Sequence, residues 1–250
     1  MDLLLISDLH LAPSSPERNQ QFLDFLEQAL KNGDQIVIAG DLFDLWLGWP
    51  DLTFDYQKPI LDRMRELMNS GLIMDYIEGN RDFSISHYRG SIFRDVYPKE
   101  SRREWSGKKL HLEHGDLINR SDRQYRLWRT LSKNRLTYFV IDRLPSWITM
   151  RLAVSLERGL RKTNQKHRMY YPEQNAEAFY TDLFQCGIDV VILGHFHIEK
   201  SVQQRLNERT VLFYNLPGWE QGFRYLVVPA GNKTPYFKDW EKDNGNSATA

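Results

Sequence analysis

Short apolar runs that end in polar residues recur along the chain. The run at 36–39 is followed by Gly40 and Asp41. A run of roughly four to eight apolar residues that stops at glycine is typical of a buried strand. Four similar runs end before Asp8-Leu9-His10, Gly79-Asn80-Arg81-Asp82, His114-Gly115-Asp116 and Gly194-His195-Phe196-His197. Packing alone does not explain why such strands end in His, Asp or Asn.

Helical patterns separate the first strands. Ser15-Pro16-Glu17 predicts the start of a helix that ends at Asn32-Gly33, and a second helix is predicted from about Gln57 to Asn69. The chain then returns as a strand at Ile73. The alternation of strands and helices predicts an α/β fold with parallel strands. Since such sheets bind ligands beyond the carboxyl ends of their strands, we expect Asp41 at that edge.

The second half of the chain is predicted to be mixed. From Ile92 to Glu113, short alternating segments surround a Ser106-Gly107 turn, which indicates mixed or antiparallel pairing. A later helix and strand are expected at Glu173–Gln185 and Ile188–Leu193. The closing short strands are predicted at Ser201–Arg205, Thr210–Asn215, Phe223–Val228 and Thr234–Phe237.

Residues 119–169 are expected to be helical and to lie over the site as a cap. At 100° per residue, one face of the first helix carries Leu127, Trp128 and Leu131, and the other carries Arg123, Arg126, Arg129 and Thr130. A second apolar stripe comprises Ile148, Leu152, Leu156 and Leu160. Because this stretch interrupts one set of candidate ligands, we predict a core of 1–118 and 170–240, a cap insertion at 119–169, and a mobile tail at 241–250.

Composition narrows the class of protein. The 250 residues are 41% hydrophobic and 26% charged, which is typical of a globular domain with one large core. The net charge is zero, yet residues 120–168 contain thirteen Lys or Arg against three acidic residues. Such a basic segment either binds an anionic partner or forms a solvent-exposed helix face. The single cysteine, Cys186, excludes an internal disulfide, and no apolar run reaches the roughly 18 residues of a membrane span.

The polar residues after the strands match the needs of two divalent ions. Such a site requires oxygen and imidazole ligands, one of them shared, and an open face for water and phosphate. The spacing of two in Asp8/His10 and in His195/His197 places both side chains of each pair on one side of an extended segment. The candidate ligands are Asp8, His10, Asp41, Asn80, His114, His195 and His197. His87, His111 and His167 stand outside these motifs and are expected to be ordinary core or surface residues.

In these motifs the sequence resembles the calcineurin-like metallophosphoesterases, whose pattern is D-x-H, G-D-x-x-D, G-N-[HR]-[DE], H-G-D and G-H-x-H. The resemblance implies an α/β fold built as a four-layer sandwich of two mixed β-sheets flanked by helices. It implies that the first metal takes Asp8, His10, Asp41 and His197, and that the second takes Asp41, Asn80, His114 and His195. It also implies that three acids orient the ligands, namely Asp44, Asp82 and Asp116.

Position 81 separates branches of that family. Many members carry His there, which can protonate a leaving group, whereas Arg81 keeps its proton near neutral pH. Arginine can instead bind phosphate oxygens through two hydrogen bonds. A pyrophosphate, whose leaving group is itself a phosphate monoester, is therefore favoured over a nucleic-acid phosphodiester. The predicted catalytic residues are Asn80, Arg81 and His195.

The stretch from Glu78 to Phe83 and the basic helical segment are similar to the branch of this family that hydrolyses UDP-2,3-diacylglucosamine in lipid A biosynthesis. This resemblance implies two Mn²⁺ ions, water attack at the α-phosphorus to give UMP and the lipid monophosphate, and acyl chains held under the cap. It also implies a cytoplasmic protein that is peripheral to the inner membrane. The implied substrate contacts are Arg81, Asp122, Asn164, Lys166 and His167. Leu160 and His167 depart from the Ser and Lys of that branch, whereas Asn164 agrees.

Three other interpretations remain open. The chain could hydrolyse a soluble nucleotide or another nucleoside-diphosphate conjugate, or it could be a non-catalytic binding module. A nuclease would also need basic helices, but the predicted cap at 119–169 has no aromatic stacking platform, so no nucleic-acid partner is expected. Trp46, Trp49 and Trp128 could line an acyl groove or belong to the core. The sequence does not indicate an oligomeric state.

Overall fold

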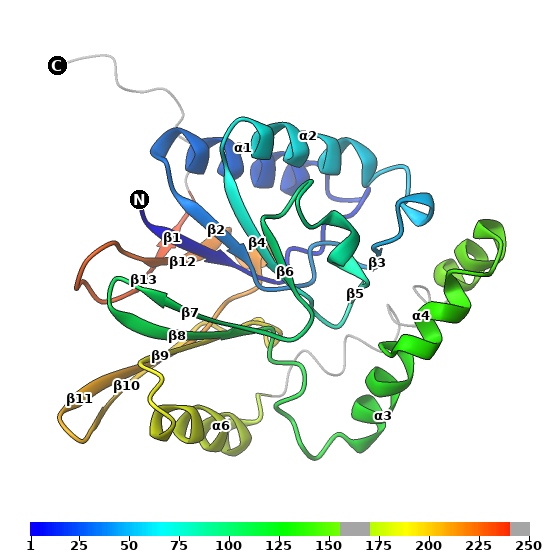
Figure 1. Ribbon diagram of the computed structural model, residues 1–250. Helices are drawn as coiled ribbons and strands as arrows, with labels where there is room; N and C mark the ends of the chain where they lie inside the picture. Colours follow the sequence, from blue (N-terminus) through cyan, green and yellow to red (C-terminus); the bar gives the residue numbers. More distant parts are fainter. Residues whose placement is uncertain (156–170, 241–250) are drawn as a thin grey trace, which may run out of the picture.

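Two mixed β-sheets pack face to face, and helices cover their outer faces (Figure 1). The computed structural model describes residues 1–155 and 171–240. Strand order is β13-β12-β1-β2-β4-β6 in the first sheet and β10-β11-β9-β8-β7 in the second. Helices α1 and α2 pack on the first sheet, and α6 packs on the second. The predicted four-layer α/β sandwich is confirmed.

The strands agree closely with the apolar runs. The first sheet contains β1 (Leu3–Ile6), β2 (Gln35–Ile38), β4 (Ile73–Ile77), β6 (Asp95–Tyr97), β12 (Arg224–Val228) and β13 (Tyr236–Asp239). The second contains β7 (Glu100–Trp105), β8 (Lys108–Glu113), β9 (Val190–Leu193), β10 (Lys200–Leu206) and β11 (Arg209–Asn215). A separate parallel pair is formed by β3 (Trp46–Leu47) and β5 (Asp82–Phe83).

The helices fall where the sequence patterns placed them. Those over the sheets are α1 (Pro16–Asn32), α2 (Lys58–Asn69) and α6 (Glu173–Gln185). Between β8 and α6 lie α3 (Arg123–Ser132), α4 (Arg135–Ile141) and a helical stretch at 146–155. Short 3₁₀ turns occur at Pro50–Leu52, Ile85–Tyr88 and Trp219–Gln221. We refer to 123–155 as the helical segment.

The direction of the strands determines where the motifs lie. In the first sheet β1, β2, β4 and β6 are parallel, so their carboxyl ends share one edge. In the second sheet β8 and β9 are parallel neighbours, with Glu113 opposite Leu193. The inner faces meet in a buried apolar layer that includes Leu3, Leu5, Leu110 and Val190. This layer brings the carboxyl ends of both sets of strands to the same edge of the sandwich.

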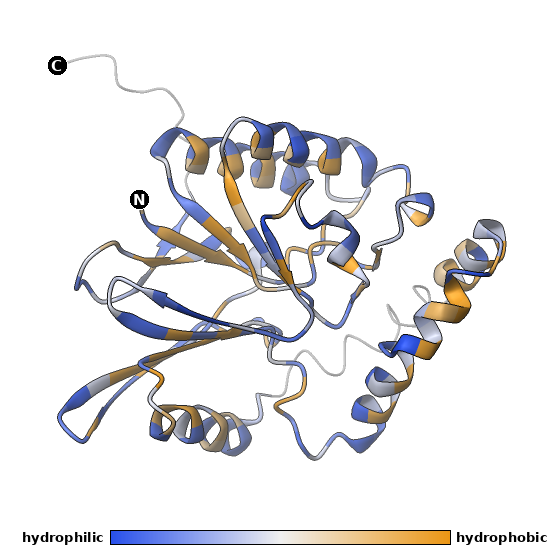
Figure 2. Ribbon diagram, viewed as in Figure 1, coloured by the Kyte–Doolittle hydropathy of each residue, from blue (hydrophilic) through white to orange (hydrophobic). Residues whose placement is uncertain are grey.

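Local sequence accounts for the ends of α1. Pro16 occupies the first turn, where a missing N–H removes no helical hydrogen bond. Gly33 has a φ of 71°, and its N–H donates to the carbonyls of Ala29 and Leu30. Apolar residues of α1 and α2 face the sheet and polar residues face outward (Figure 2). The predicted boundaries of this helix are confirmed.

The predicted orientation of α3 is wrong. Leu127 and Leu131 are 62% and 60% exposed, whereas Arg129, expected on the polar face, is only 7% exposed. The cause is a tertiary contact, because Arg129 forms an ion pair with the buried Asp116. A period-based prediction treats every arginine as a surface residue and does not detect such a partner. Only Trp128 of the expected apolar face is partly buried.

The tryptophans divide between two apolar clusters. Trp46 is fully buried in the core beside α1 and α2. Trp49 and Trp128 pack on a smaller cluster that joins the helical segment to the core through Leu45, Leu47, Leu52, Phe83 and Ala153. Leu156 and Leu160 of the predicted second stripe lie outside the described residues, as do 241–250. Within 1–155 and 171–240, no helix has both the length and the apolarity that crossing a membrane requires.

The observed face of α3 can be tested by stability measurements. Leu131→Ser should change the free energy of unfolding by less than about 0.5 kcal/mol, because the side chain is exposed. Trp128→Ala should cost about 2–4 kcal/mol, because it removes packing against the apolar cluster. Urea unfolding followed by circular dichroism measures both. A larger loss in Leu131→Ser than in Trp128→Ala would indicate that the helix faces the other way.

Candidate metal centre

The residues that follow five strands converge at one edge of the sandwich. Asp8 and His10 follow β1, Asp41 follows β2, and Asn80 follows β4. From the second sheet, His114 follows β8, and His195 and His197 follow β9. Their side chains lie in or near the interior, with Asp8, Asp41 and His114 at most 2% exposed. The structure therefore brings all seven predicted ligands together.

The first group consists of Asp8, His10 and His197. Asp8 Oδ1 lies 3.3 Å from His197 Nε2 and 4.0 Å from His10 Nε2, and the two imidazole rings stack with centroids 5.2 Å apart. Ligand atoms that each lie about 2.1 Å from one ion are separated by about 3–4 Å. His10 Nε2 is buried and has no hydrogen-bond partner in the described part of the chain. Both observations fit a divalent cation.

The second group surrounds Asn80. Its Oδ1 lies 3.0 Å from His114 Nε2 and 3.0 Å from His195 Nδ1. Asp41 Oδ1 lies 3.8 Å from His114 Nε2. Ligand atoms of Asp8, Asp41 and His114 all lie within 4.8 Å of one another. Asp8 thus belongs to both candidate groups, and the sharing role expected of Asp41 stays a prediction.

Partners behind the imidazoles orient them. His114 Nδ1 lies 2.7 Å from the Ala39 carbonyl, so its hydrogen points there and Nε2 is left for the site. His10 Nδ1 lies 3.4 Å from Asp44 Oδ1, and the orienting role expected of Asp44 stays a prediction. His197 Nδ1 lies 3.4 Å from Glu220 Oε1, a residue that the sequence analysis missed. The available signal was the Pro217-Gly218 pair, which comes just before the 3₁₀ turn that contains Glu220.

Asp82 holds backbone and not a ligand side chain. Its Oδ2 accepts hydrogen bonds from Asp41 N at 2.9 Å, from Gly79 N at 2.7 Å and from the hydroxyl of Tyr76 at 2.7 Å. The loops after β2 and β4 are therefore fixed to the same carboxylate. Burial, and then the charge of Asp41, raise the pKa of Asp82 to about 6.

The backbone at this edge is strained. Five candidate ligands have φ between 47° and 72°, a left-handed backbone conformation that residues other than glycine rarely adopt: Asp8, His10, Asp41, His195 and His197. Glycines allow the loops to approach each other. A Cβ on Gly79 would lie 2.2 Å from Asp41 Oδ1. Strain of this kind, concentrated among candidate ligands, is typical of a functional site.

Two histidines differ in charge in the ion-free protein. Burial lowers the pKa of His197, but Asp8 and Glu220 outweigh it and raise that pKa to about 10. Burial, and then the proximity of His114, lower the pKa of His195 to about 4. At neutral pH His197 is therefore protonated beside Asp8, and His195 is neutral. A cation bound by the first group would replace the proton of His197.

Of the residues predicted to contact the substrate, the structure describes Arg81 and Asp122. Arg81 is buried; its N–H donates to Asp41 Oδ1 at 2.9 Å and its Nη1 donates to the Asp44 carbonyl at 3.3 Å. The Asp122 carboxylate caps α3 by accepting from Tyr125 N at 2.9 Å. Asn164, Lys166 and His167 lie outside the described residues.

Contacts with residues other than the candidate ligands are made by Asp116, His87 and His111. Asp116 accepts from the Tyr125 hydroxyl and from Arg129 Nε. His87 is exposed, whereas His111 is buried 3.2 Å from Glu113 and close enough to Glu100 to form a third candidate group. Glu100 also pairs with Arg102 at 3.0 Å, so this group is already an ion-pair network.

Comparisons with known proteins found a family model and relatives of similar sequence. The family model described as calcineurin-like phosphoesterase matches residues 1–199. A UDP-2,3-diacylglucosamine hydrolase of Psychromonas ingrahamii is 25% identical, covering 91% of this chain and 94% of that protein. One of Pseudomonas putida is 30% identical, covering 89% and 97%. Among solved structures, an archaeal phosphodiesterase is 13% identical, covering 96% and 100%, with a TM-score of 0.49.

The close approach of the two loops gives a test of the centre. Gly79→Ala should weaken divalent-ion binding by roughly 10-fold or more, because the new methyl group would displace Asp41. Gly107→Ala is the control for a general loss of stability, since its φ of 76° makes alanine strain the backbone there, but the added methyl group would meet no atom within 4 Å. Calorimetric titration of ion-free protein with Mn²⁺ measures both affinities. Equal affinities in the two variants would contradict the assignment of Asp41.

Proposed function

The chain belongs to the calcineurin-like phosphoesterase family, and on that premise we propose that it hydrolyses the pyrophosphate of UDP-2,3-diacylglucosamine to UMP and the lipid monophosphate. The relatives named for this activity support the substrate. The observation that carries the proposal is the convergence of seven carboxylate, amide and imidazole ligands beside the buried Arg81.

We propose two Mn²⁺ ions as cofactors. The first would be held by Asp8, His10, Asp41 and His197, and the second by Asp41, Asn80, His114 and His195. Carboxylate, amide oxygen and imidazole together suit Mn²⁺ as well as neighbouring metals of the first row. When bound, the ions polarise the phosphate oxygens and lower the pKa of the attacking water.

The protein side chains then orient the phosphates. Arg81 is fixed behind Asp41 and Asp44, so its guanidinium is preorganised for a pyrophosphate without being able to protonate it. Water adds to the α-phosphorus as the bond to the bridging oxygen breaks, and the lipid phosphate leaves. Its charge needs stabilisation more than a proton, which is the role we assign to Arg81. We assign to Asn80 and His195 the contacts with the reacting phosphate.

We propose that residues 119–169 act as a cap for the acyl chains. An open hollow in this part of the surface is lined by Trp147, Met150, Arg151, Val154 and Ser155. Apolar walls beside an arginine suit a ligand with both acyl chains and negative charge. In this proposal Asp122, Asn164, Lys166 and His167 contact the sugar and phosphate.

The exposed side chains of the helical segment support contact with a membrane surface. Seven large apolar residues there are exposed: Leu127, Leu131, Leu136, Phe139, Val140, Trp147 and Leu152. Five exposed arginines accompany them: Arg123, Arg126, Arg135, Arg143 and Arg151. The guanidinium carbons of Arg143 and Arg151 lie 3.4 and 5.6 Å from the ring centres of Phe139 and Trp147. Exposed apolar and basic residues on one helical segment suit an anionic bilayer.

Replacing Arg81 separates catalysis from metal binding. Arg81→Ala should lower kcat by about 100-fold or more while Mn²⁺ affinity stays within about twofold, because the guanidinium acts on phosphate and not on the ions. Arg81→Lys should recover part of the loss. Release of UMP from the acylated substrate is the assay, with Asp41→Ala as the variant expected to lose both turnover and ion binding.

The same assay identifies the substrate. A preference for acylated over deacylated UDP-glucosamine supports the lipid proposal. Equal rates would favour a hydrolase of soluble nucleoside-diphosphate conjugates. Full activity in Asp41→Ala would contradict the two-metal site itself.

Membrane contact can be measured with vesicles that contain anionic phosphatidylglycerol. The double variant Leu136→Ser/Phe139→Ser should bind at least roughly 10-fold more weakly, because two exposed apolar side chains no longer enter the interface. Tyr236→Ser, which changes an exposed aromatic residue on β13, is the control and should bind as the unchanged protein does. Co-sedimentation gives the affinities, and high salt should weaken binding. Indistinguishable affinities would remove this part of the proposal.

A further inference from the structure

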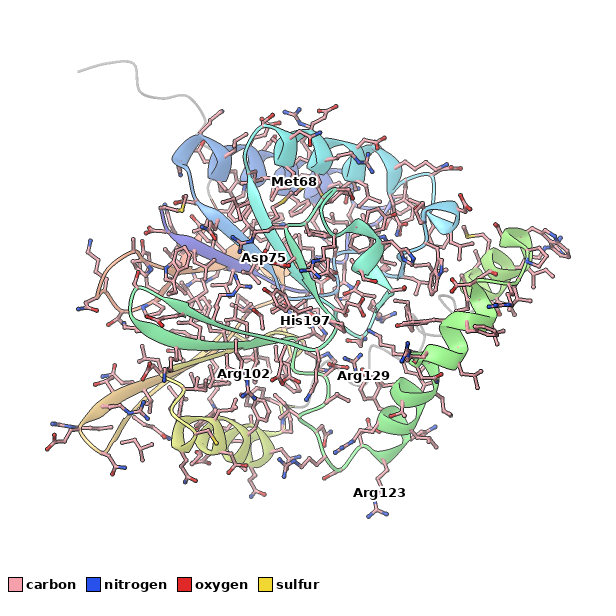
Figure 3. All side chains as sticks on the ribbon, viewed as in Figure 1. Met68, Asp75, Arg102, Arg123, Arg129 and His197 are labelled. Carbon is pink, nitrogen blue, oxygen red and sulfur yellow. The ribbon has the colours of Figure 1, made fainter. Side chains whose placement is uncertain are left out.

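Helix α3 presents one polar face to the candidate metal centre. Tyr125 and Arg129 are four residues apart and share a side of the helix, and Lys133 directly follows its last residue. Figure 3 shows Arg129 between α3 and the core, whereas Arg123 points from the same helix into solvent. The Lys133 side chain is 8% exposed. Such deep burial of basic groups requires specific partners.

One partner lies in the loop that carries His114. Arg129 Nε lies 2.9 Å from Asp116 Oδ2, and the Tyr125 hydroxyl donates to the same oxygen. Asp116 is 4% exposed and stands two residues after His114. The left-handed Gly115 between them, with a φ of 99°, turns the chain sharply. Fixing Asp116 therefore fixes the position from which His114 extends.

The other partner lies in the loop that carries Asn80. Lys133 Nζ donates to the carbonyl oxygen of Gly79, which belongs to the peptide bond that joins Gly79 to Asn80. The ammonium group also lies 4.0 Å from Glu78 Oε2 and 5.1 Å from the ring centre of Phe83. Glu78 Oε1 in turn accepts from Ile85 N at 2.8 Å, which ties the two ends of this loop together.

We propose that Arg129 and Lys133 are positioning residues for the second metal. They hold the two loops that carry Asn80 and His114, whose ligand atoms lie 3.0 Å apart. No hydrogen bond or ion pair joins α3 to Asp8, His10 or His197 among the described residues. The position of α3 therefore affects the binding of the second ion and not that of the first. This rests on the two-metal part of the proposed function and is independent of the substrate.

The test is a titration of the full-length, ion-free protein with Mn²⁺, in which electron paramagnetic resonance counts the free ion. In Arg129→Gln and Lys133→Met, one equivalent of Mn²⁺ should bind roughly 10- to 100-fold more weakly, which is the usual loss when a residue that orients a metal ligand is replaced. The affinity for the other equivalent should stay within about twofold. Arg129→Lys should recover part of the affinity, because an ammonium can still pair with Asp116.

Two control variants separate positioning from a general loss of stability. Arg123→Gln changes an exposed arginine of the same helix. Arg103→Gln breaks a different buried ion pair, in which Nη1 lies 2.7 Å from Oδ2 of the buried Asp75. Both controls should bind two equivalents of Mn²⁺ with unchanged affinity. If Lys133→Met fails to fold, the Arg129 variants carry the test alone.

A double-variant comparison identifies which ion is affected. Adding Arg129→Gln to Asn80→Ala should cause no further loss, since the second site is already damaged, whereas adding it to His10→Ala should cause the full loss. Unchanged binding of both equivalents in folded Arg129→Gln, an equal weakening of both, or the same effect in Arg103→Gln would overturn the proposal. Altered binding in a protein that leaves the glycolipid intact would keep this proposal and remove the substrate.

Discussion

The structure depends on holding five residues, four of them buried, in a left-handed backbone at one edge of two sheets. Each such residue costs about 1–2 kcal/mol relative to ordinary backbone, so the conformation persists only where its surroundings impose it. Here β1, β2 and β9 are apolar on both faces, and Asp82 fixes two of the loops through two hydrogen bonds to their backbone. The packing of the sandwich thus supplies the free energy that keeps carboxylates and imidazoles close together.

Much of this arrangement could be predicted because its signals are local. An apolar run, a glycine and a polar residue occupy fewer than ten consecutive positions, and strand direction then places all such motifs at one edge. The ends of α1 follow from Pro16 and Gly33 for the same reason. The identity of the candidate ligands needed only the motifs. The backbone that carries them was not predicted, because Asp8, His10, His195 and His197 are left-handed and not part of the extended segments that the spacing of two suggested.

The errors arise where a partner is distant in sequence. Arg129 appeared to belong to a solvated face, but its acceptor Asp116 is supplied by the loop after β8. Glu220 reaches His197 only because β11 returns beside β9. In α3, two leucines are consequently left outside while charged groups are buried. A periodic pattern predicts which face of an isolated helix would be buried. In α3 the hydrogen-bond acceptor in another loop buries a different face.

The order of strands in the first sheet has a consequence for biogenesis. Asp8 follows β1, which lies between β2 and β12, so its strand gains its second neighbour only once residues 224–228 exist. The candidate ligands themselves extend to His197. A nascent polypeptide on the ribosome therefore lacks a complete centre until most of it has emerged. Only a polypeptide synthesised at least as far as His197 carries all seven candidate ligands.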